Sequence, residues 1–155
     1  MRIPLIGYIS KKKVAEPRIE DILVPRLARE CAQLIAIYHT ETNYGYDNSN
    51  EGKWWVYIKK WPLPAGLNSK VSDIILIIPK DYPVKPPTKI FIPKEVKSLS
   101  GEPLENFLPV MLEAAPEYWQ GYCIPTHYWR AGDDMERVLR TVQTIIQVSL
   151  YLKKQ

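Results

Sequence analysis

Apolar residues recur at helical spacing in two stretches, one early in the chain and one at its end. In the first, the apolar positions after Pro25 gather on one side of a helical wheel; they are Leu27, Cys31, Leu34, Ile35 and Tyr38. Proline suits a first helical turn, so the pattern predicts a helix from Pro25 to about Tyr38. In the second, the periodic positions are Met135, Val138, Leu139, Val142, Ile145, Ile146 and Leu150. Asp133 or Asp134 can cap the free amides at the start of this C-terminal helix.

Between the two helical stretches the pattern changes to that of strands. Side chains alternate from residue 53 to residue 61, with Trp54, Val56 and Ile58 on one face and Trp55, Tyr57 and Lys59 on the other. Residues 74–78 are five consecutive branched apolar residues, which predict a strand buried on both faces. Residues 90–92 predict a short strand closed by Pro93. The breaks are too short for crossover helices, so an antiparallel meander is expected.

Other segments carry weaker patterns. Residues 43–52 concentrate Asn, Gly, Asp and Ser, the composition of a turn or loop. Prolines 79, 83, 86 and 87 lack a backbone donor, so the strand before them must end there. After Pro93, about 35 residues show no sustained periodicity, apart from a possible short helix over 104–115. Such a long stretch in a compact domain is usually functional, and this one contains Cys123.

These patterns predict an α+β fold in which an N-terminal helix, an antiparallel meander sheet, a cysteine-bearing loop and a C-terminal helix follow one another. The 155 residues, 46% apolar and 25% charged, fit a single domain over residues 1–155. Residues 1–24 are an N-terminal arm that the pattern leaves open. Within it Ile3, Leu5 and Tyr8 permit a strand, whereas Ile19, Ile22 and Leu23 have helical spacing.

Charge and hydropathy exclude several classes of partner. The formal charge of +4 is too small and too dispersed to indicate nucleic acid. The basic runs, 11–13 and 153–154, lie near the ends of the sequence, where solvated tails are the simpler interpretation. No apolar run approaches the ~20 residues of a membrane helix, and residues 1–10 lack a leader-peptide pattern. We therefore expect a cytoplasmic protein that binds neither nucleic acid nor membrane.

The two cysteines require separate explanations, because a reducing compartment leaves both as thiols. Cys31 lies on the apolar helical stripe, where it acts as a small core residue. Cys123 lies in the aperiodic, aromatic-rich segment, where either a nucleophile or a structural thiol fits. Cysteine and histidine show no zinc spacing and no glycine-rich phosphate loop occurs, so no metal or cofactor is expected.

The order of parts resembles the ubiquitin-conjugating enzyme family. In that family an apolar strand enters a Tyr-Pro-x-x-Pro-Pro element, which is similar to Tyr-Pro-Val-Lys-Pro-Pro at residues 82–87. Residues 129–139 are similar to the family's tryptophan-to-helix segment, and this alignment puts Cys123 at or within two residues of the catalytic cysteine. The resemblance covers roughly residues 25–150.

The chain also departs from the eukaryotic pattern. The family's His-Pro-Asn tripeptide, which supports the oxyanion, is missing, since residues 112–122 contain no asparagine. The sequence to Gln155 ends with the first C-terminal helix, so we do not expect the two further helices common in the eukaryotic enzymes. The chain looks more like the compact bacterial relatives found in antiphage defence operons, which often lack the tripeptide.

The resemblance implies an enzyme that accepts the C-terminal acyl group of a ubiquitin-like modifier from an ATP-dependent activating enzyme. Cys123 would hold this group as a thioester and pass it to an amine of a protein target, such as a nucleotide-cyclising immune sensor or a phage structural protein. A thiol suits this work because its thiolate attacks well and its thioester stays reactive. The alternative, which the missing asparagine keeps open, is a catalytically inactive binding module of the same fold that holds a ubiquitin-like or scaffold protein.

Transfer to an amine needs an oxyanion donor and a group that takes the proton of the amine. His127, four residues after Cys123, is the candidate for either role, although it also suits a turn cap or packing against Trp129. Gln120 and Tyr122 are further oxyanion candidates, and loop amides are another source.

Overall fold

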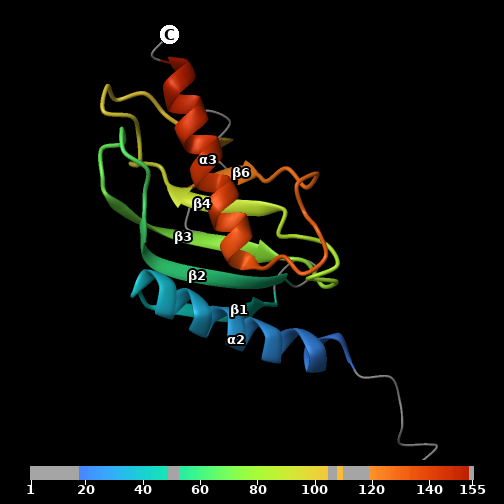
Figure 1. The fold of residues 1–155 in the computed structure, drawn as a ribbon. Helices are drawn as coiled ribbons and strands as arrows, with labels where there is room; N and C mark the ends of the chain where they lie inside the picture. The colour runs from blue at the N-terminus through green and yellow to red at the C-terminus, as the bar shows by residue number, and fades with distance from the viewer. Residues whose placement is uncertain (1–17, 49–52, 105–107, 110–118, 154–155) are drawn as a thin grey trace, which may run out of the picture.

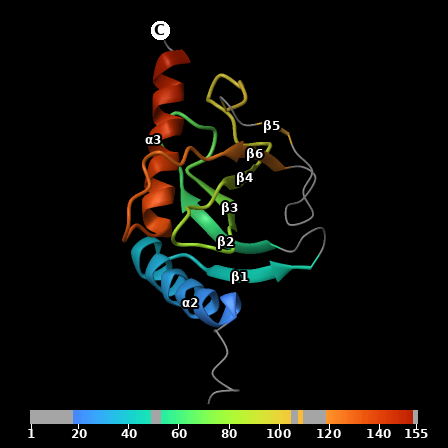
Figure 2. The ribbon, with the colours of Figure 1, turned by 90° about the vertical axis from the view of Figure 1, so that its right-hand side faces the viewer.

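The structure is a computed structural model that describes residues 18–48, 53–104, 108–109 and 119–153. Its elements, in chain order, are α2 (Ile19–Tyr38), β1 (Thr42–Asp47), β2 (Lys53–Pro62), β3 (Val71–Ile78), β4 (Lys89–Pro93), β5 (Leu108–Pro109), β6 (Trp119–Cys123) and α3 (Met135–Lys153). The six strands form one antiparallel sheet in the order β1-β2-β3-β4-β6-β5. Both helices lie on the same face of this sheet (Figures 1 and 2), which we call the helix face. The predicted α+β class and antiparallel sheet are confirmed, with β1 to β4 as a meander, whereas β6 lies between β4 and β5.

The main core lies between the helix face and the two helices. Its sheet side chains are Val56, Ile58, Ile74, Leu76, Ile78, Ile90 and Ile92. A second cluster lies on the opposite face, where Ile75, Ile77, Phe91 and Trp119 are buried and Trp55 and Tyr57 pack against them. Because side chains alternate along a strand, β3 supplies both clusters, as its continuous apolar run predicts. The alternation assigned to β2 is likewise confirmed.

A bulge in β2 brings Trp61 back to the helix face. The register with β3 shifts between Ile58 and Trp61, and Lys60 takes a left-handed φ of 51°. Asp73 on β3 holds this conformation, since its carboxylate accepts the Lys60 amide at 3.0 Å and the Tyr57 hydroxyl at 2.8 Å. Trp61 is thereby fully buried.

The first helix begins earlier than expected. Periodicity after Pro25 predicted the start there, but α2 begins at Ile19 and Pro25 lies inside it. The Asp21 carboxylate accepts the Arg18 amide at 3.2 Å at the helix start, and Leu23 extends the buried stripe by a turn. Ile35, which the pattern placed on the stripe, is 43% exposed. Residues 1–17 of the expected arm lie outside the described residues.

A strand replaces the loop expected over residues 43–52. Thr42–Asp47 forms β1 and pairs with β2 from Thr42↔Ile58 to Asp47↔Lys53. A Cβ on Gly45 would lie 2.3 Å from the Trp55 ring, so the glycine leaves room for the indole to cover its strand. Polar and glycine-rich composition therefore does not exclude a strand here, because Tyr44 and Tyr46 of β1 pack against Trp54 and Gly45 makes room for Trp55 of β2. Residues 49–52 lie outside the described residues.

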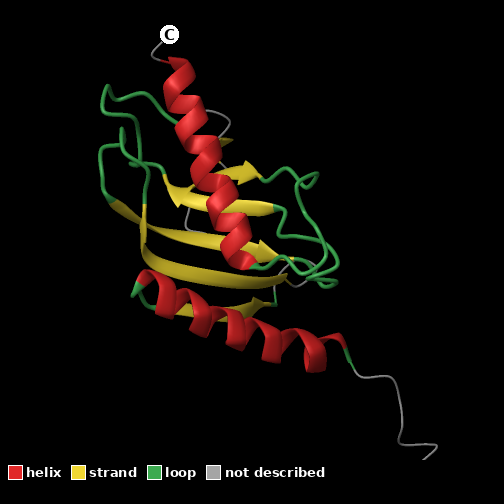
Figure 3. Cartoon of the chain, viewed as in Figure 1, coloured by secondary structure: helices red, strands yellow, loops and turns green. Residues whose placement is uncertain are grey.

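The segment between β4 and α3 is less irregular than the sequence suggested (Figure 3). Trp119–Cys123 forms β6, so Cys123 ends a strand and is not within a loop. Of the helix proposed over 104–115, Leu104 is not helical and Leu108–Pro109 is the short strand β5; the other residues lie outside those described. The final helix is confirmed, and Asp134 caps it by accepting the Arg137 amide at 3.2 Å.

Candidate functional site

Cys123 is an exposed thiol at the end of β6. Its cross-strand partner is Lys89 at the start of β4, which in turn pairs with Ile77 on β3. Residues directly opposite one another in an antiparallel sheet point to the same side. The Cys123 and Lys89 side chains therefore share the face of the sheet away from the helices, at the end of the row that continues through Ile77 and Trp55.

The second cysteine is chemically different. Cys31 on α2 is only 5% exposed and lies in the main core, as the sequence predicted. Burial, with a smaller contribution from the charge of Glu30, raises the pKa of its thiol to about 12. Because the thiolate is the reactive form, Cys31 is unsuited to acyl chemistry, and Cys123 is the accessible thiol of the pair.

The chain after Cys123 is tied back to the proline-rich link between β3 and β4. The Ile124 amide donates to the Thr88 carbonyl at 2.9 Å. Further along, the indole N–H of Trp129 donates to the Pro83 carbonyl at 2.9 Å, and its ring lies 6.0 Å from that of Tyr82. These contacts fix the start and the far part of the segment that leads from the thiol to α3.

Glu30 joins this link to both helices. Its buried carboxylate accepts the Tyr82 hydroxyl at 2.5 Å and the Met135 amide at 2.8 Å through Oε1, and Arg26 Nε at 2.6 Å through Oε2. The Met135 amide is one of the free donors at the start of α3, where a carboxylate is favoured. This hub sets where α3 begins and therefore where the segment after Cys123 ends. Nothing in the local sequence pattern indicates it, since Glu30 lies beside the apolar stripe.

The two oxyanion candidates lie on the same strand as Cys123. Gln120 is 3% exposed, and its amide nitrogen donates to the Pro93 carbonyl at 3.0 Å and to the Val96 carbonyl at 3.2 Å. Tyr122 packs against the main core. Burial, followed by the charge of nearby Cys123, raises the pKa of the Tyr122 hydroxyl. Gln120 and Tyr122 alternate with Cys123 along the strand and point toward the helix face.

His127 lies in an exposed turn four residues beyond the thiol. Among the described residues, no hydrogen bond or ion pair joins His127 to Cys123. The turn is closed by the Trp129 amide, which donates to the Thr126 carbonyl at 3.1 Å. Asp133 accepts the Arg130 amide at 2.8 Å, so it closes the next turn while Asp134 caps α3. The expectation that an aspartate caps this helix is confirmed for Asp134, whereas Asp133 closes the turn before it.

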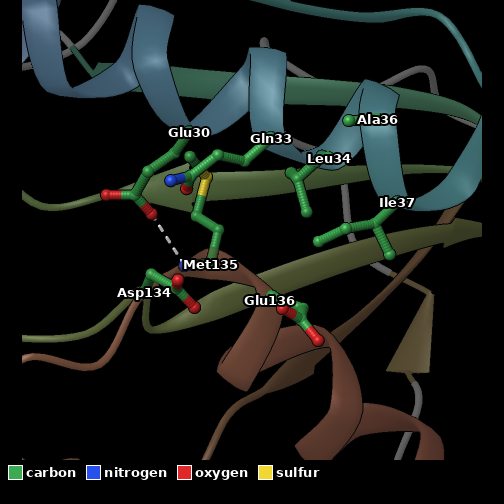
Figure 4. Close-up of a pocket in the computed structure, with 8 residues that line it drawn as sticks. All are labelled: Glu30, Gln33, Leu34, Ala36, Ile37, Asp134, Met135 and Glu136. Atoms are coloured by element: carbon green, nitrogen blue, oxygen red, sulfur yellow. Dashed lines mark hydrogen bonds between the residues drawn. The ribbon is translucent and has the colours of Figure 1, made fainter.

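A groove of about 290 Å³ separates α2 from the start of α3 (Figure 4). Leu34, Ile37 and Met135 form its apolar wall, and Asp134 and Glu136 supply carboxylates. Both carboxylates already have partners, since Asp134 caps the helix and Glu136 pairs with Arg140 at 3.3 Å. The groove opens on the helix side of the sheet, away from the face that carries Cys123.

Lys89 is the residue near the thiol that the sequence did not single out. The two residues are far apart in the chain, and only the register of β4 against β6 brings them together. The sequence does contain one indication: Lys89 is a charged residue at the start of a strand whose other residues are buried, so its side chain is expected to be exposed.

A sheet with an N-terminal and a C-terminal helix on one face, and an exposed cysteine shortly before the second helix, is the arrangement expected of a ubiquitin-conjugating-enzyme-like protein. The family model described as Prokaryotic E2 family E matches residues 36–150, and the chain belongs to this family. The resemblance to bacterial ubiquitin-conjugating-enzyme-like proteins is thus confirmed. Neither a search of curated proteins nor one of solved structures found a match.

Membership of this family associates the chain with ubiquitin-like conjugation in general terms, and hence with a modifier and an activating enzyme. Within the described part of the chain, neither helix has an apolar stretch sufficient to cross a bilayer.

Proposed function

We propose that this protein carries a ubiquitin-like modifier as a thioester on Cys123 and transfers it to an amine of a target protein. The Cys123 thiolate attacks the acyl carbon of the modifier's thioester on an ATP-dependent activating enzyme, and the C–S bond to that enzyme breaks with its electron pair leaving on the enzyme's thiolate. The target amine then attacks the Cys123 thioester, an amide bond forms, and the C–S bond breaks to release Cys123.

The observation that carries this proposal is the exposure of Cys123 at the end of β6 in a member of a prokaryotic E2 family. A modifier tail needs open approach to sulfur, and an exposed strand end on the face without helices provides it. The buried Cys31 supplies an internal contrast, because it lacks both access and an available thiolate.

The side chains near Cys123 have two kinds of role: some hold the strand in place, and one is proposed to take part in the reaction. Gln120 uses its amide protons to hold the β4–Val96 turn, so its role is to fix β6 rather than to donate to an oxyanion. Tyr122 alternates with Cys123 along β6 and packs on the helix face, so its hydroxyl lies on the side of the sheet away from the proposed thioester and supports the strand. His127, exposed on the following turn, is available to take the proton that the attacking amine loses.

The partners follow from the same scheme. They are a ubiquitin-like modifier, its activating enzyme and a protein target, in the bacterial cytoplasm and in the setting of antiviral defence. A nucleotide-cyclising immune sensor is a target compatible with that setting, by analogy with the compact bacterial relatives.

Mixing the protein with modifier, activating enzyme and ATP tests the proposal. The wild type should form an adduct that thiol reductants release, Cys123→Ser should give at most a hydroxylamine-labile ester, and Cys123→Ala should give none. Cys31→Ala is the matched control and should load normally. A reductant-insensitive association that is equal in wild type and both Cys123 variants would instead establish the binding-module alternative.

A further inference from the structure

Lys89 and Cys123 are directly opposite residues of β4 and β6. The hydrogen bond from the Ile124 amide to the Thr88 carbonyl lies one residue beyond this pair, which makes it a non-hydrogen-bonded pair. In such pairs the two Cβ atoms are roughly 4.5–5.5 Å apart, so a lysine side chain reaches well past its neighbour. The Lys89 ammonium therefore lies within reach of any group bonded to the Cys123 sulfur.

The ammonium is also free to act. Among the described residues no carboxylate forms an ion pair with Lys89, whereas Lys59 and Lys85 each have one. Buried Ile77 flanks Lys89 on the side away from Cys123, so the apolar stem of the lysine has a wall to lie against. The amide nitrogen of Gln120 is already bonded on the other face.

We propose that Lys89 is a catalytic residue that binds the oxyanion formed at the Cys123 thioester, in the place of the missing asparagine. This inference rests on the proposed function. When the amine nitrogen attacks the acyl carbon of the thioester, the carbonyl π electrons move to the carbonyl oxygen. That oxygen becomes negatively charged, and it is bonded to the same carbon as the Cys123 sulfur. The Nζ–H of Lys89 donates to that oxygen.

The tetrahedral intermediate then collapses to the amide product. The oxygen electrons re-form the C=O bond, the C–S bond breaks, and its electron pair leaves on the Cys123 thiolate. The extra proton of the nitrogen passes to a base, and Lys89 ends the cycle as the ammonium it was at the start. A fixed positive charge at the developing oxyanion is the form of stabilisation that contributes most in acyl transfer.

The test needs no unidentified partner. Cys123 is acylated to completion by exchange with the N-acetylglycine thioester of 2-mercaptoethanesulfonate, and discharge onto free L-lysine is followed by mass spectrometry. The variants are Lys89→Met, which keeps the stem, Lys89→Arg, which keeps the charge, and Lys94→Met, which removes an exposed lysine after the other end of β4. Thermal unfolding confirms that each variant is folded.

Lys89→Met should slow discharge by about tenfold or more, since loss of one preorganised oxyanion donor costs about a hundredfold or more in enclosed sites. Lys89→Arg should restore most of the rate, and Lys94→Met should match the wild type. Discharge of Lys89→Met within twofold of the wild type overturns the proposal. Transfer of the acyl group onto Lys89 itself, seen as a reductant-resistant adduct at that residue, also overturns it, because Lys89 would then be an acceptor.

Failure of the proposed function gives a different result. In that case the small thioester still acylates Cys123 and the Lys89 variants still differ, but modifier and activating enzyme produce no Cys123 adduct.

Discussion

Replacement of Glu30 by alanine should destabilise the protein strongly, although Glu30 is distant in sequence from every other part of the site. Its carboxylate accepts three hydrogen bonds, from Tyr82, Met135 and Arg26, at 2.5, 2.8 and 2.6 Å. Alanine removes all three acceptors at once. The Tyr82 hydroxyl and the Met135 amide are then left in the interior without a partner, whereas Arg26 is partly exposed and can turn to water.

The expected loss in the free energy of unfolding can be worked out from these contacts. A buried donor left unsatisfied costs about 1–3 kcal/mol, so the two donors together cost roughly 2–6 kcal/mol. Breaking a buried ion pair by removal of one partner costs about 3–5 kcal/mol, which agrees with that range. We expect a loss near 4 kcal/mol in the free energy of unfolding, or roughly 8–16 °C in Tm for a chain of this size. Tyr82→Phe, which removes one donor and leaves the others paired, should cost about 1 kcal/mol.

Urea unfolding monitored by tryptophan fluorescence measures these differences, because Trp129 contacts the ring of Tyr82. Glu41→Ala is the matched control: it removes a carboxylate that pairs with Lys59 at 3.2 Å but is 62% exposed, and it should change stability by less than about 1 kcal/mol. A loss below about 1 kcal/mol for Glu30→Ala would refute the view that Glu30 joins the helices and the proline-rich link.

Four further outcomes are expected. Iodoacetamide should modify Cys123 in the native protein and Cys31 only after unfolding, as read by peptide mass spectrometry. Burial raises the pKa of Cys31 from 9.0 to about 12, so the unfolded chain loses this proton first and the unfolding free energy should fall from pH 9 toward pH 12, less steeply in Cys31→Ala. Gly45→Ala should cost about 1–3 kcal/mol because its Cβ meets Trp55 at 2.3 Å, and this cost should largely vanish when Trp55 is replaced by alanine. His127→Ala should leave thioester loading intact and slow discharge onto lysine; an unchanged rate removes His127 from the mechanism.

The parts of the fold that were predictable are those whose own side chains make the core. The continuous apolar run of β3 and the long apolar period of α3 each specify an element without help from elsewhere. In contrast, β1 and β6 contain glycine and polar residues, and their strand conformation depends on partners in β2 and β4. The start of α2 was predicted too late because proline suits a first helical turn, whereas Pro25 lies inside this helix.

The candidate site likewise has features that could be predicted from the sequence and features that could not. The exposure of Cys123 could be anticipated, because a thiol off the apolar stripes of the sequence stands out, but its place at the end of a strand could not. Lys89 could not, since its place beside Cys123 is a matter of strand register, which local periodicity does not encode. The contacts of Gln120 could not be predicted either, because the two carbonyls that it binds belong to the last residue of β4 and to the turn that follows it.

The position of Cys123 on the side of the sheet away from α2 and α3 also bears on how the loaded state is recognised. Under the proposed function, a polypeptide bonded to this sulfur would begin on the face of the sheet opposite to the helices. A protein that docks on the helical side would then not contact the bond to sulfur directly. Such a protein can select the loaded carrier only by touching the attached polypeptide itself.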